Sequence, residues 1–594
     1  MTRLRPWLTA AMLGAIAASI GAPAMARAKA APVQALHAVI ADFDRYQKRA
    51  DPISAGLEGD PAALRVWPDD SPAAVAARKA ALEGFHKRLA ALKDVRLPPE
   101  DALNRDDLAW TVDDDLQGIA FDQEREPFTT DNGPFDNADY VARSTAIHSL
   151  TDAEAWIARL QALPAYYETE IANARRGIAT GFLQPRYVAE VAAKAARIRA
   201  DQPADQSPLL LPFAELPATI PAADQAALRA RVLDLAANGV KPQERAYAAM
   251  LRDEYLPKAP ASLAARDLPD GARYYAWLVR HHTTTGLTPD QIHALGVSEV
   301  ARIRARMDGV IAETGFKGSF ADFLAYLRSD PRFYARTPEA LLADASEIVK
   351  RIDDKLPANF ATLPRLTFGV RPVPAEIADG YTSARYWQGS PQQGIAGGFM
   401  VNTSHLDQRP LYELPALALH EAIPGHHLQI ALAQERTDLP FFRREGGFDA
   451  FVEGWALYSE GLGEEMGIYR DPYERFGRLS MEMWRACRLV ADTGVHWLGW
   501  TRDQARACFT DNTALAAKNI DVELDRYISW PGQALAYKIG ELRILALRKR
   551  AQAALGPRFD IRRFHDQILL PGPLPLDLLE QRLDAWIKAE KAKG

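Results

Sequence analysis

The chain has 594 residues, of which 25% are charged, with a formal net charge of -6 and a pI near 6.1. This length exceeds one ordinary hydrophobic core, so it predicts a large multi-lobed body or a few closely packed subdomains. Charges of both signs are interspersed, and without a basic surface the chain is not expected to bind nucleic acid. Cys487 and Cys508 are too few for a disulfide scaffold or a cysteine-ligated structural zinc, and whether they pair is open.

The first 28 residues have the pattern of a cleavable secretory signal peptide. Arg3 and Arg5 precede an apolar run of mostly small residues, and small side chains place the cleavage near Ala26 or Ala28. No cysteine follows this run to accept a lipid, and no later stretch has the roughly 18 uninterrupted apolar residues of a membrane span. We therefore expect a periplasmic or secreted protein without stable membrane insertion.

Most of the remaining chain has apolar residues at helical spacing, and several helices are expected to begin at capping residues such as Thr151 and Thr288. We expect an N-terminal helical lobe over residues 29–200, followed by a proline-rich connector over 201–224. Residues 225–594 are expected to form a catalytic helical region.

The pattern changes between about 364 and 403, where β-type residues are bounded by glycine and proline. A small sheet is therefore expected directly before the segment 412–540, which carries the candidate metal site. The expected fold class is mainly α: a multi-helical body with a small β-sheet next to the metal-binding helix and a deep cleft. His281 and His282 lack a carboxylate at ligand spacing, so we expect packing roles for them.

The segment HEAIPGHHLQ, residues 420–429, contains the candidate histidine ligands. Zinc peptidases place two histidines one helical turn apart so that both reach one tetrahedral ion. Here the next histidines come six and seven residues after His420. Pro424 has no N–H for the His420 carbonyl and its ring clashes there, so the helix must break or bulge near residues 423–425.

If two residues loop out of the helix, His420 and His426 come one helical turn apart, whereas His427 would require three residues to loop out. We therefore expect His426 as the second ligand, with His427 as the alternative or as a residue that supports a ligand or faces the substrate. A catalytic zinc also needs a third protein ligand and an open position for water. Glu453, in the helical run DAFVEGWALYSE, is the best candidate.

Two further carboxylates lie on the same predicted helix face as Glu453. Asp449, one turn earlier, could orient a ligand histidine. Glu460, two turns later, is a competing ligand, although helices that cross at one metal usually offer one position each. The alternatives for this set are a polar helix end with chance histidines and a buried ion pair at Glu453.

Four segments in order, HEAIPGHHLQ, FVEGWALYSE, RLVADTGVHWLGW and SWPGQALAYKIG, resemble the bacterial family labelled domain of unknown function 885 over roughly residues 35–590. A His-Glu helix followed by a glutamate on a second helix also resembles the gluzincins of the thimet oligopeptidase and angiotensin-converting-enzyme type. The two extra residues before Gly-His depart from that pattern. The resemblance implies a gluzincin-like (zincin) helical fold and metallopeptidase activity with one Zn²⁺ per chain.

By the same analogy, Glu421 would act as general base and take a proton from the attacking water. It would then pass this proton to the leaving amine. His496 and Tyr537 are the expected donors to the developing oxyanion, followed by Tyr527. A substrate carboxylate could be bound by cationic residues of these downstream segments: Arg485, Arg488 and Lys538.

Gly397 and Gly398, in GGFMVNT, resemble the edge strand beside the metal helix of zincins, where a peptide can add as an extended strand. The expected function is thus exported, zinc-dependent hydrolysis of peptide bonds in short peptides. The alternatives are a zinc amidase acting on a non-peptide or modified-peptide amide and a catalytically inactive periplasmic binding protein. The presence of Glu421 argues against the binding protein, which would not need a general base.

Overall fold

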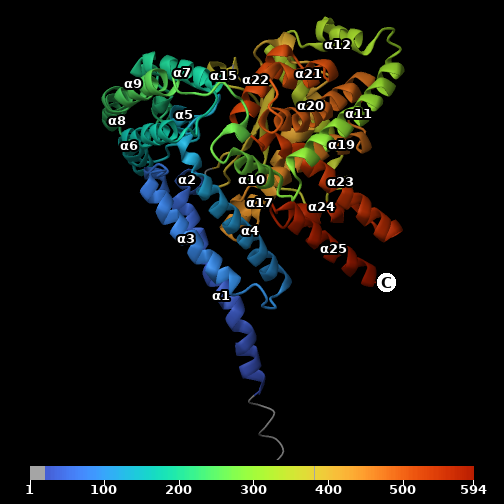
Figure 1. Cartoon of the computed structure of the whole chain (residues 1–594), viewed down its shortest axis with the longest axis horizontal. Coiled ribbons are helices and arrows are strands. Elements are labelled where there is room, and N and C mark those ends of the chain that lie inside the picture. Colours follow the sequence, from blue (N-terminus) through green and yellow to red (C-terminus); the bar gives the residue numbers. More distant parts are fainter. Residues whose placement is uncertain (1–20, 380, 393, 594) are drawn as a thin grey trace, which may run out of the picture.

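The structure, a computed structural model, describes residues 21–379, 381–392 and 394–593 and is mainly helical with one small sheet (Figure 1). The expected class, a mainly α protein with a small sheet, is confirmed. Most of the expected signal peptide lies outside the described residues, and its last residues belong to the first helix, α1 (Gly21–Ala50). Within the described part of the chain, no helix has the length and apolar character that a membrane crossing requires.

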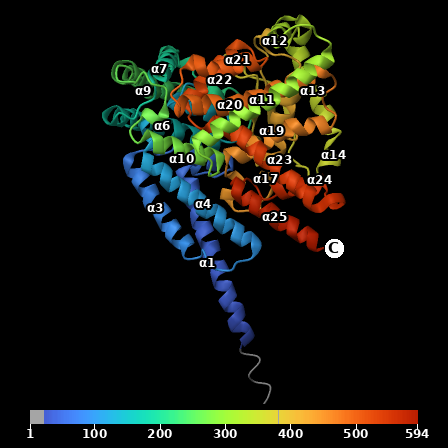
Figure 2. The ribbon, with the colours of Figure 1, turned by 45° about the vertical axis from the view of Figure 1, so that its right-hand side comes forward.

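The first helices form a separate layer at one end of the molecule. α3 (Pro72–Ala90) and α4 (Pro99–Phe121) pack on each other and on α1 around apolar side chains such as Phe43 and Phe85. Figures 1 and 2 show these three helices side by side at one end of the molecule, where α1 projects outward and α4 lies next to α10 and α25.

A compact helical group follows, and the segment 201–224 lies inside it. α8 and α9, which come after this segment, pack against α6 and α7, which come before it. The segment itself contains two short helical turns, η3 and η4. The elements up to Tyr255 are α2 (Pro52–Leu57), η1 (Ala63–Arg65), η2 (Gln123–Arg125), α5 (Pro134–Arg143), α6 (Leu150–Thr180), α7 (Arg186–Asp201), η3 (Ala204–Gln206), η4 (Pro208–Phe213), α8 (Ala222–Asp234), η5 (Leu235–Val240), α9 (Lys241–Met250) and η6 (Leu251–Tyr255).

The rest of the chain builds a larger helical body, in which α11 (Pro289–Thr314) lies along α20 (Pro472–His496). Its other helical elements are η7 (Ala265–Asp267), α10 (Gly271–Thr283), α12 (Phe320–Ser329), η8 (Pro331–Phe333), α13 (Pro338–Asp353), α14 (Leu356–Asn359), α15 (Ala375–Ala378), η9 (Leu406–Gln408), α16 (Leu414–Leu417), η10 (Ala418–Ala422), α17 (His426–Glu435), α18 (Phe441–Glu445), α19 (Asp449–Glu465), α21 (Arg502–Asn512), α22 (Ala517–Ser529), η11 (Gln533–Leu535), α23 (Ala536–Leu555), η12 (Gly556–Arg558), α24 (Ile561–Leu569) and α25 (Leu576–Ala592).

The small sheet lies where it was expected, but its order differs from the expectation. β1 (Phe368–Pro372) runs parallel to β3 (Gly397–Val401), and β2 (Ala384–Trp387) runs antiparallel to β3, in the order β1-β3-β2. The prediction that GGFMVNT forms an edge strand is therefore wrong. All five residues of β3 are buried, as is typical of a central strand with neighbours on both sides.

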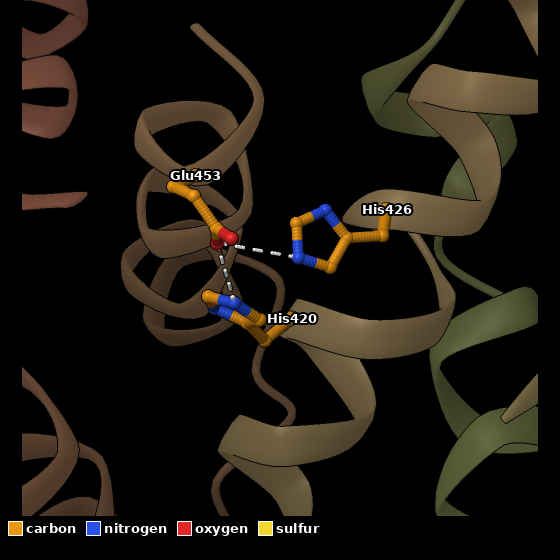
Figure 3. Close-up of side chains that lie close together, drawn as sticks. All are labelled: His420, His426 and Glu453. Atoms are coloured by element: carbon orange, nitrogen blue, oxygen red, sulfur yellow. Dashed lines mark ion pairs between the residues drawn. The ribbon is translucent and has the colours of Figure 1, made fainter. Parts of the chain in front are cut away.

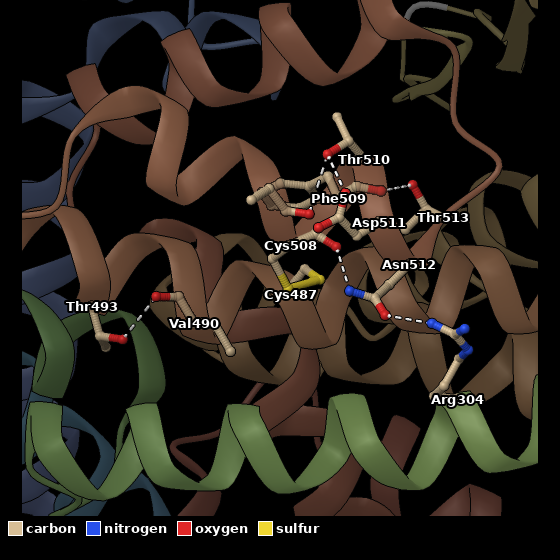
Figure 4. The surroundings of a disulfide bond; sticks show 11 residues. Arg304, Cys487, Val490, Thr493, Cys508, Phe509, Thr510, Asp511, Asn512 and Thr513 are labelled. Atoms are coloured by element: carbon tan, nitrogen blue, oxygen red, sulfur yellow. Dashed lines mark hydrogen bonds between the residues drawn. A yellow bond between two sulfur atoms is a disulfide. The ribbon is translucent and has the colours of Figure 1, made fainter. Parts of the chain in front are cut away.

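Two contacts hold pairs of helices together in the C-terminal part of the chain: a disulfide bond between α20 and α21, and a close backbone approach of α19 and α23. Cys487 of α20 and Cys508 of α21 form a disulfide bond (Figure 4), so the pairing that the sequence left open is present. α19 and α23 touch backbone to backbone, because a Cβ atom on Gly454 would lie 2.5 Å from the Cα atom of Gly540. This close approach places the helix of Glu453 directly against the helix of Tyr537.

Candidate metal centre

The segment that carries the histidines is helical on both sides of a break. The π-helical turn η10 is followed by Ile423 in extended conformation (φ -122°, ψ 136°), and α17 begins at His426. The predicted break is confirmed. A Cβ atom on Gly425 would lie only 1.9 Å from the His420 carbonyl oxygen. The backbone at position 425 can therefore pass this close to the end of η10 only because the residue is glycine.

His420, His426 and Glu453 point toward one another (Figure 3). Glu453 Oε2 lies 3.4 Å from His420 Nε2 and 3.3 Å from His426 Nε2. One donor atom from each residue lies within 4.8 Å of the other two. Donors on a tetrahedral zinc ion are separated by about 3.3 Å, given bonds of about 2.0–2.1 Å. In donor type and spacing, the three residues fit a zinc ion.

The electrostatics of these side chains also favour a cation. Burial lowers the pKa of His420, but its contacts with Glu453 and Glu460 outweigh burial and raise this pKa to about 9. Burial raises the pKa of Glu453, yet the neighbouring imidazoles His426 and His420 hold it well below its usual range. The surroundings of these three side chains therefore favour a positive charge at this point, which either a proton or a metal ion can supply.

Glu460 is the carboxylate that orients His420. Its Oε1 atom lies 2.8 Å from His420 Nδ1 and 3.2 Å from Arg485 Nη2. Asp449, expected in this role, instead lies 2.6 Å from Nδ1 of His282 on α10. The expectation was wrong because Asp449, at the start of α19, faces α10. The same contact shows that His282 does have a carboxylate partner, supplied from far along the chain.

His427 lies apart from the cluster. Its Nδ1 atom is 3.1 Å from the Tyr386 hydroxyl, and its Nε2 atom is 3.0 Å from the Leu366 carbonyl oxygen. The ring centre lies 4.5 Å from that of Phe368. The fold thus places His426, and not the alternative His427, beside His420.

The three candidate ligands line a cavity of about 340 Å³, together with Glu421 and Tyr537. Glu421 Oε2 accepts a hydrogen bond of 2.7 Å from the backbone N–H of Tyr386 on β2. The Tyr537 ring stacks on the His420 ring at a centroid separation of 6.3 Å. Burial, reinforced by Glu453, raises the pKa of Tyr537, so its hydroxyl stays protonated and able to donate.

His496 and Tyr527, two of the expected oxyanion donors, are used elsewhere. His496 accepts from the backbone N–H of Ala265 at 3.2 Å and donates to the Tyr527 carbonyl at 2.9 Å, and burial lowers its pKa to about 4. The Tyr527 hydroxyl donates to Glu523 at 2.8 Å and accepts from Arg488 at 2.6 Å. Neither residue lines the cavity, so both expectations are wrong.

Lys538 and the two glycines also lie outside the cavity. Lys538 Nζ lies in a buried ion-pair cluster, 2.8 Å from Glu482 and 3.2 Å from Glu299, so its charge is already paired and does not bind a substrate carboxylate. Gly397 and Gly398 belong to the central strand β3. The edge strand β2 lines the cavity in their place.

Arg485 and Arg488 do line the cavity, and the structure adds two arginines that sequence reasoning missed, Arg385 on β2 and Arg526 on α22. Arg526 was signalled by its spacing, because it follows Glu523 by three residues in an amphipathic helix. Arg385 had no signal beyond its place in the expected sheet region. Its position at the cavity depends on the order of the strands.

Comparison with known proteins places these observations in a family. Residues 52–583 match the family described as bacterial protein of unknown function, DUF885. The crystal structure of a putative lipoprotein from Colwellia psychrerythraea is similar over 94% of this chain and 99% of its own, with a TM-score of 0.88 and 28% identity. A putative lipoprotein of unknown function from Shewanella oneidensis shares the fold, with a TM-score of 0.69 and 18% identity over 93% of this chain and 99% of its own.

A shorter similarity involves type III pantothenate kinases of Burkholderia cenocepacia and Burkholderia orbicola. Each is 29% identical to this chain over 120 residues, which is 20% of this chain and 37% of the kinase. The chain thus spans little more than a third of the curated relatives that it matches.

Proposed function

The chain belongs to the DUF885 family of bacterial proteins of unknown function, and we propose that this member is a zinc-dependent metallopeptidase of gluzincin-like fold that hydrolyses peptide bonds of short peptides. The observation that carries the proposal is the convergence of His420, His426 and Glu453 at a cavity that Glu421 also lines. Two imidazoles and one carboxylate leave the fourth position of a tetrahedral zinc open, which is the ligand set of catalytic rather than structural zinc sites.

The residues around the cavity supply the remaining steps of hydrolysis. Zinc bound by the three ligands would polarise the substrate carbonyl and lower the pKa of water. Glu421 uses Oε2 to accept the Tyr386 N–H, so Oε1 is left to take a proton from the attacking water and pass it to the leaving amine. Tyr537, with its protonated hydroxyl, donates a hydrogen bond to the developing oxyanion.

The surroundings of the site favour a peptide as substrate. β2 lines the cavity with residues 384–386. It is an edge strand of the sheet, and apart from the Tyr386 N–H, which Glu421 accepts, its outer edge could pair with an extended peptide. A second cavity, of about 800 Å³, is lined by α1, α4, α10 and α19 and shares Asp449 and Trp530 with the first. In this proposal the two adjoining cavities are the deep cleft, which would admit an unfolded chain segment and exclude a folded protein.

The proposed place of action is outside the cytoplasm. The N-terminal sequence has the pattern of a signal peptide, and the two structural relatives are both described as putative lipoproteins. The Cys487–Cys508 disulfide suits an oxidising compartment.

Metal content and peptide turnover test the proposal together. The zinc-loaded protein is expected to hold one zinc per chain by mass spectrometry and to cleave members of a mixed peptide library. Glu421→Gln should keep the zinc and lose turnover by a factor of about 10²–10⁴, because it removes only the general base. His420→Ala and His426→Ala should lose both zinc and turnover.

His427→Ala is the matched control, because it removes the neighbouring imidazole without removing a proposed ligand. Zinc lost from this variant but retained by His426→Ala would overturn the ligand assignment. Full activity of Glu421→Gln would refute the mechanism. Bound zinc without cleavage of any peptide would favour the amidase, and a protein that takes up no zinc would favour a binding protein.

A further inference from the structure

One wall of the metal cavity carries more positive than negative charge. Arg488 of α20 and Arg526 of α22 line it with Glu523. Both guanidiniums direct Nη2 to the same oxygen, Glu523 Oε2, at 3.0 Å each. A single carboxylate therefore serves two arginines that are only 2% and 8% exposed.

A third cation faces the same cavity. Arg385 lies exposed on β2, with its guanidinium 5.4 Å from the Tyr381 ring centre, and it forms no ion pair with a described residue. Asp131 also lines the cavity, but it is exposed and has no ion pair within the described residues. Among these five side chains three arginines face two acids, whereas Arg485 and the acids Glu413, Glu421, Asp449 and Glu453 also line the cavity.

The buried arginines also have unused hydrogen-bonding capacity. Arg488 Nη1 and Arg526 Nε are buried and have no hydrogen-bond partner among the described residues. A buried guanidinium keeps the cost of its lost hydration unless an anion pairs with it. An anionic group bound at this wall would balance the charge, and a carboxylate matches the planar fork of an arginine.

The distance from this wall to the metal site limits which carboxylate can bind. Arg488 Cζ lies 4.0 Å from the centre of the Tyr537 ring, and that ring centre lies 6.3 Å from the His420 ring centre. Laid end to end, these distances equal about three residues of extended chain, at roughly 3.3–3.6 Å per residue. A carboxylate held by Arg488 therefore belongs to a residue within about three positions of the scissile bond.

We propose that the arginine wall, defined as Arg385, Arg488 and Arg526, binds the α-carboxylate of the peptide substrate, so that the enzyme removes one to three residues from the carboxyl end. This inference rests on the proposed peptidase function and names its substrate class. An aspartate or glutamate side chain near the scissile bond offers the same carboxylate chemistry, and the experiment separates the two sources.

Three matched peptides test the source of the carboxylate with the zinc-loaded protein. They are acetyl-pentaalanine as the free acid, the same peptide as its C-terminal amide, and the amide with glutamate as its last residue. We expect the free acid to be cleaved with a kcat/KM at least about 100-fold above that of the amide, because the amide offers no carboxylate to Arg488 Nη1 and Arg526 Nε, which have no other partner among the described residues. Product masses should show the loss of one to three C-terminal residues.

The other outcomes overturn the inference in distinct ways. Equal cleavage of acid and amide would support the peptidase function but refute the proposed carboxylate-binding site. Restored cleavage of the glutamate-containing amide would assign the wall to a side-chain carboxylate and not to the chain terminus.

Arg385→Gln is the variant of choice, because this side chain is exposed and its loss does not unbalance the core. We expect it to lower kcat/KM for the free acid about tenfold, mainly by raising KM, and to leave the amide unaffected. Arg371→Gln, at an exposed arginine of the same sheet that does not line the cavity, is the matched control and should change neither. Equal effects of the two variants would contradict the proposal.

If no peptide is cleaved, the peptidase function is refuted. A binding measurement can still test the arginine wall in that case. Chelator-treated protein is titrated calorimetrically with acetyl-dialanine and with its amide, so that a carboxylate cannot bind a metal. The acid is expected to bind about tenfold more tightly, and Arg385→Gln should remove the difference. Equal affinity of the wild-type protein for acid and amide would overturn the inference.

Discussion

Glu460 contacts the proposed metal site without being one of its three proposed ligands. It is fully buried, lies 2.8 Å from His420 Nδ1 and is itself paired with Arg485. A carboxylate in this position keeps the proton on Nδ1 and turns Nε2 toward the metal. The charge of Glu460 therefore controls how well His420 can act as a ligand.

We expect Glu460→Gln to weaken zinc binding by about 10- to 100-fold, because an amide orients the imidazole but does not raise its basicity. Competition with a zinc chelator of known affinity measures this change. Glu465→Gln is the control, since Glu465 lies on the same helix, is 57% exposed and pairs with Arg548 away from the site. Equal zinc affinities of the two variants would show that Glu460 has no role in ligation.

Glu413 is a buried acid of the same cavity whose titration should be visible in stability. Burial raises its pKa to about 8, although Arg485, Arg328 and Arg409 oppose the shift. Since the folded-state pKa lies above the ordinary value of 4.5, the stability contribution is complete below that value and is lost as the pH rises through about 8.

Glu413→Gln removes this titration. Its free energy of unfolding relative to wild type should therefore rise by up to about 1.4 kcal/mol per pH unit between roughly pH 5 and 8, and then level off. Urea unfolding of both proteins across this range measures the difference. A difference that is constant with pH would contradict the assignment.

At the scale of elements, the site depends on the junction between η10 and α17. The break lets two short helical segments each contribute one histidine, which a continuous helix with this spacing could not do. α19 then brings Glu453 to the same point, and its glycine contact with α23 fixes how far Tyr537 lies from the ligands.

Gly425→Ala should therefore damage both the fold and the site. The new Cβ atom would lie 1.9 Å from the His420 carbonyl oxygen and 2.5 Å from that of Leu419, and both are backbone atoms that cannot move aside independently. We expect a loss of about 3 kcal/mol or more in the free energy of unfolding, together with the loss of zinc.

Gly309→Ala is the control for this substitution, because Gly309 lies within α11 with open space around its Cβ position. It should be neutral or stabilise the protein by up to about 1 kcal/mol. Chemical denaturation and metal analysis of both variants provide the measurements. Normal zinc content in Gly425→Ala would show that the junction tolerates a side chain.

At the scale of the whole molecule, the metal site is a small part of a large core. One cluster of buried apolar residues extends from Trp67 to Ile587 and includes Leu419 and Trp455, close to the ligands in sequence. The three ligand side chains account for little of the surface that the protein buries on folding, because this apolar cluster is so large. We therefore expect the fold not to depend on the metal. Such independence is what we expect of the proposed catalytic site, whereas a structural zinc site would contribute to folding.

We expect removal of zinc by a chelator to leave the far-ultraviolet circular dichroism unchanged at 25 °C and to lower the melting temperature. Bound zinc stabilises the folded state by about 4 kcal/mol when its free concentration is about 1,000 times Kd. Thermal unfolding with and without the chelator measures the shift. Loss of helical structure on chelation at 25 °C would identify the metal as structural.

The sequence by itself determined the features that follow from local rules. Apolar periodicity predicted the mainly helical class and the small sheet. The missing N–H of Pro424 predicted the helix break, and the requirement for clustered nitrogen and oxygen donors selected His420, His426 and Glu453, which the structure brings together.

Only the tertiary structure decided which side chains meet across elements. The sequence offered Asp449 as the carboxylate that orients a ligand histidine and Glu460 as a competing ligand, and the positions of α10 and η10 determine that Asp449 meets His282 while Glu460 meets His420. The strand order in the same way makes β2 the edge strand at the cavity and places Arg385 there. Such contacts depend on how helices and strands pack, and residue spacing along one element does not contain that information.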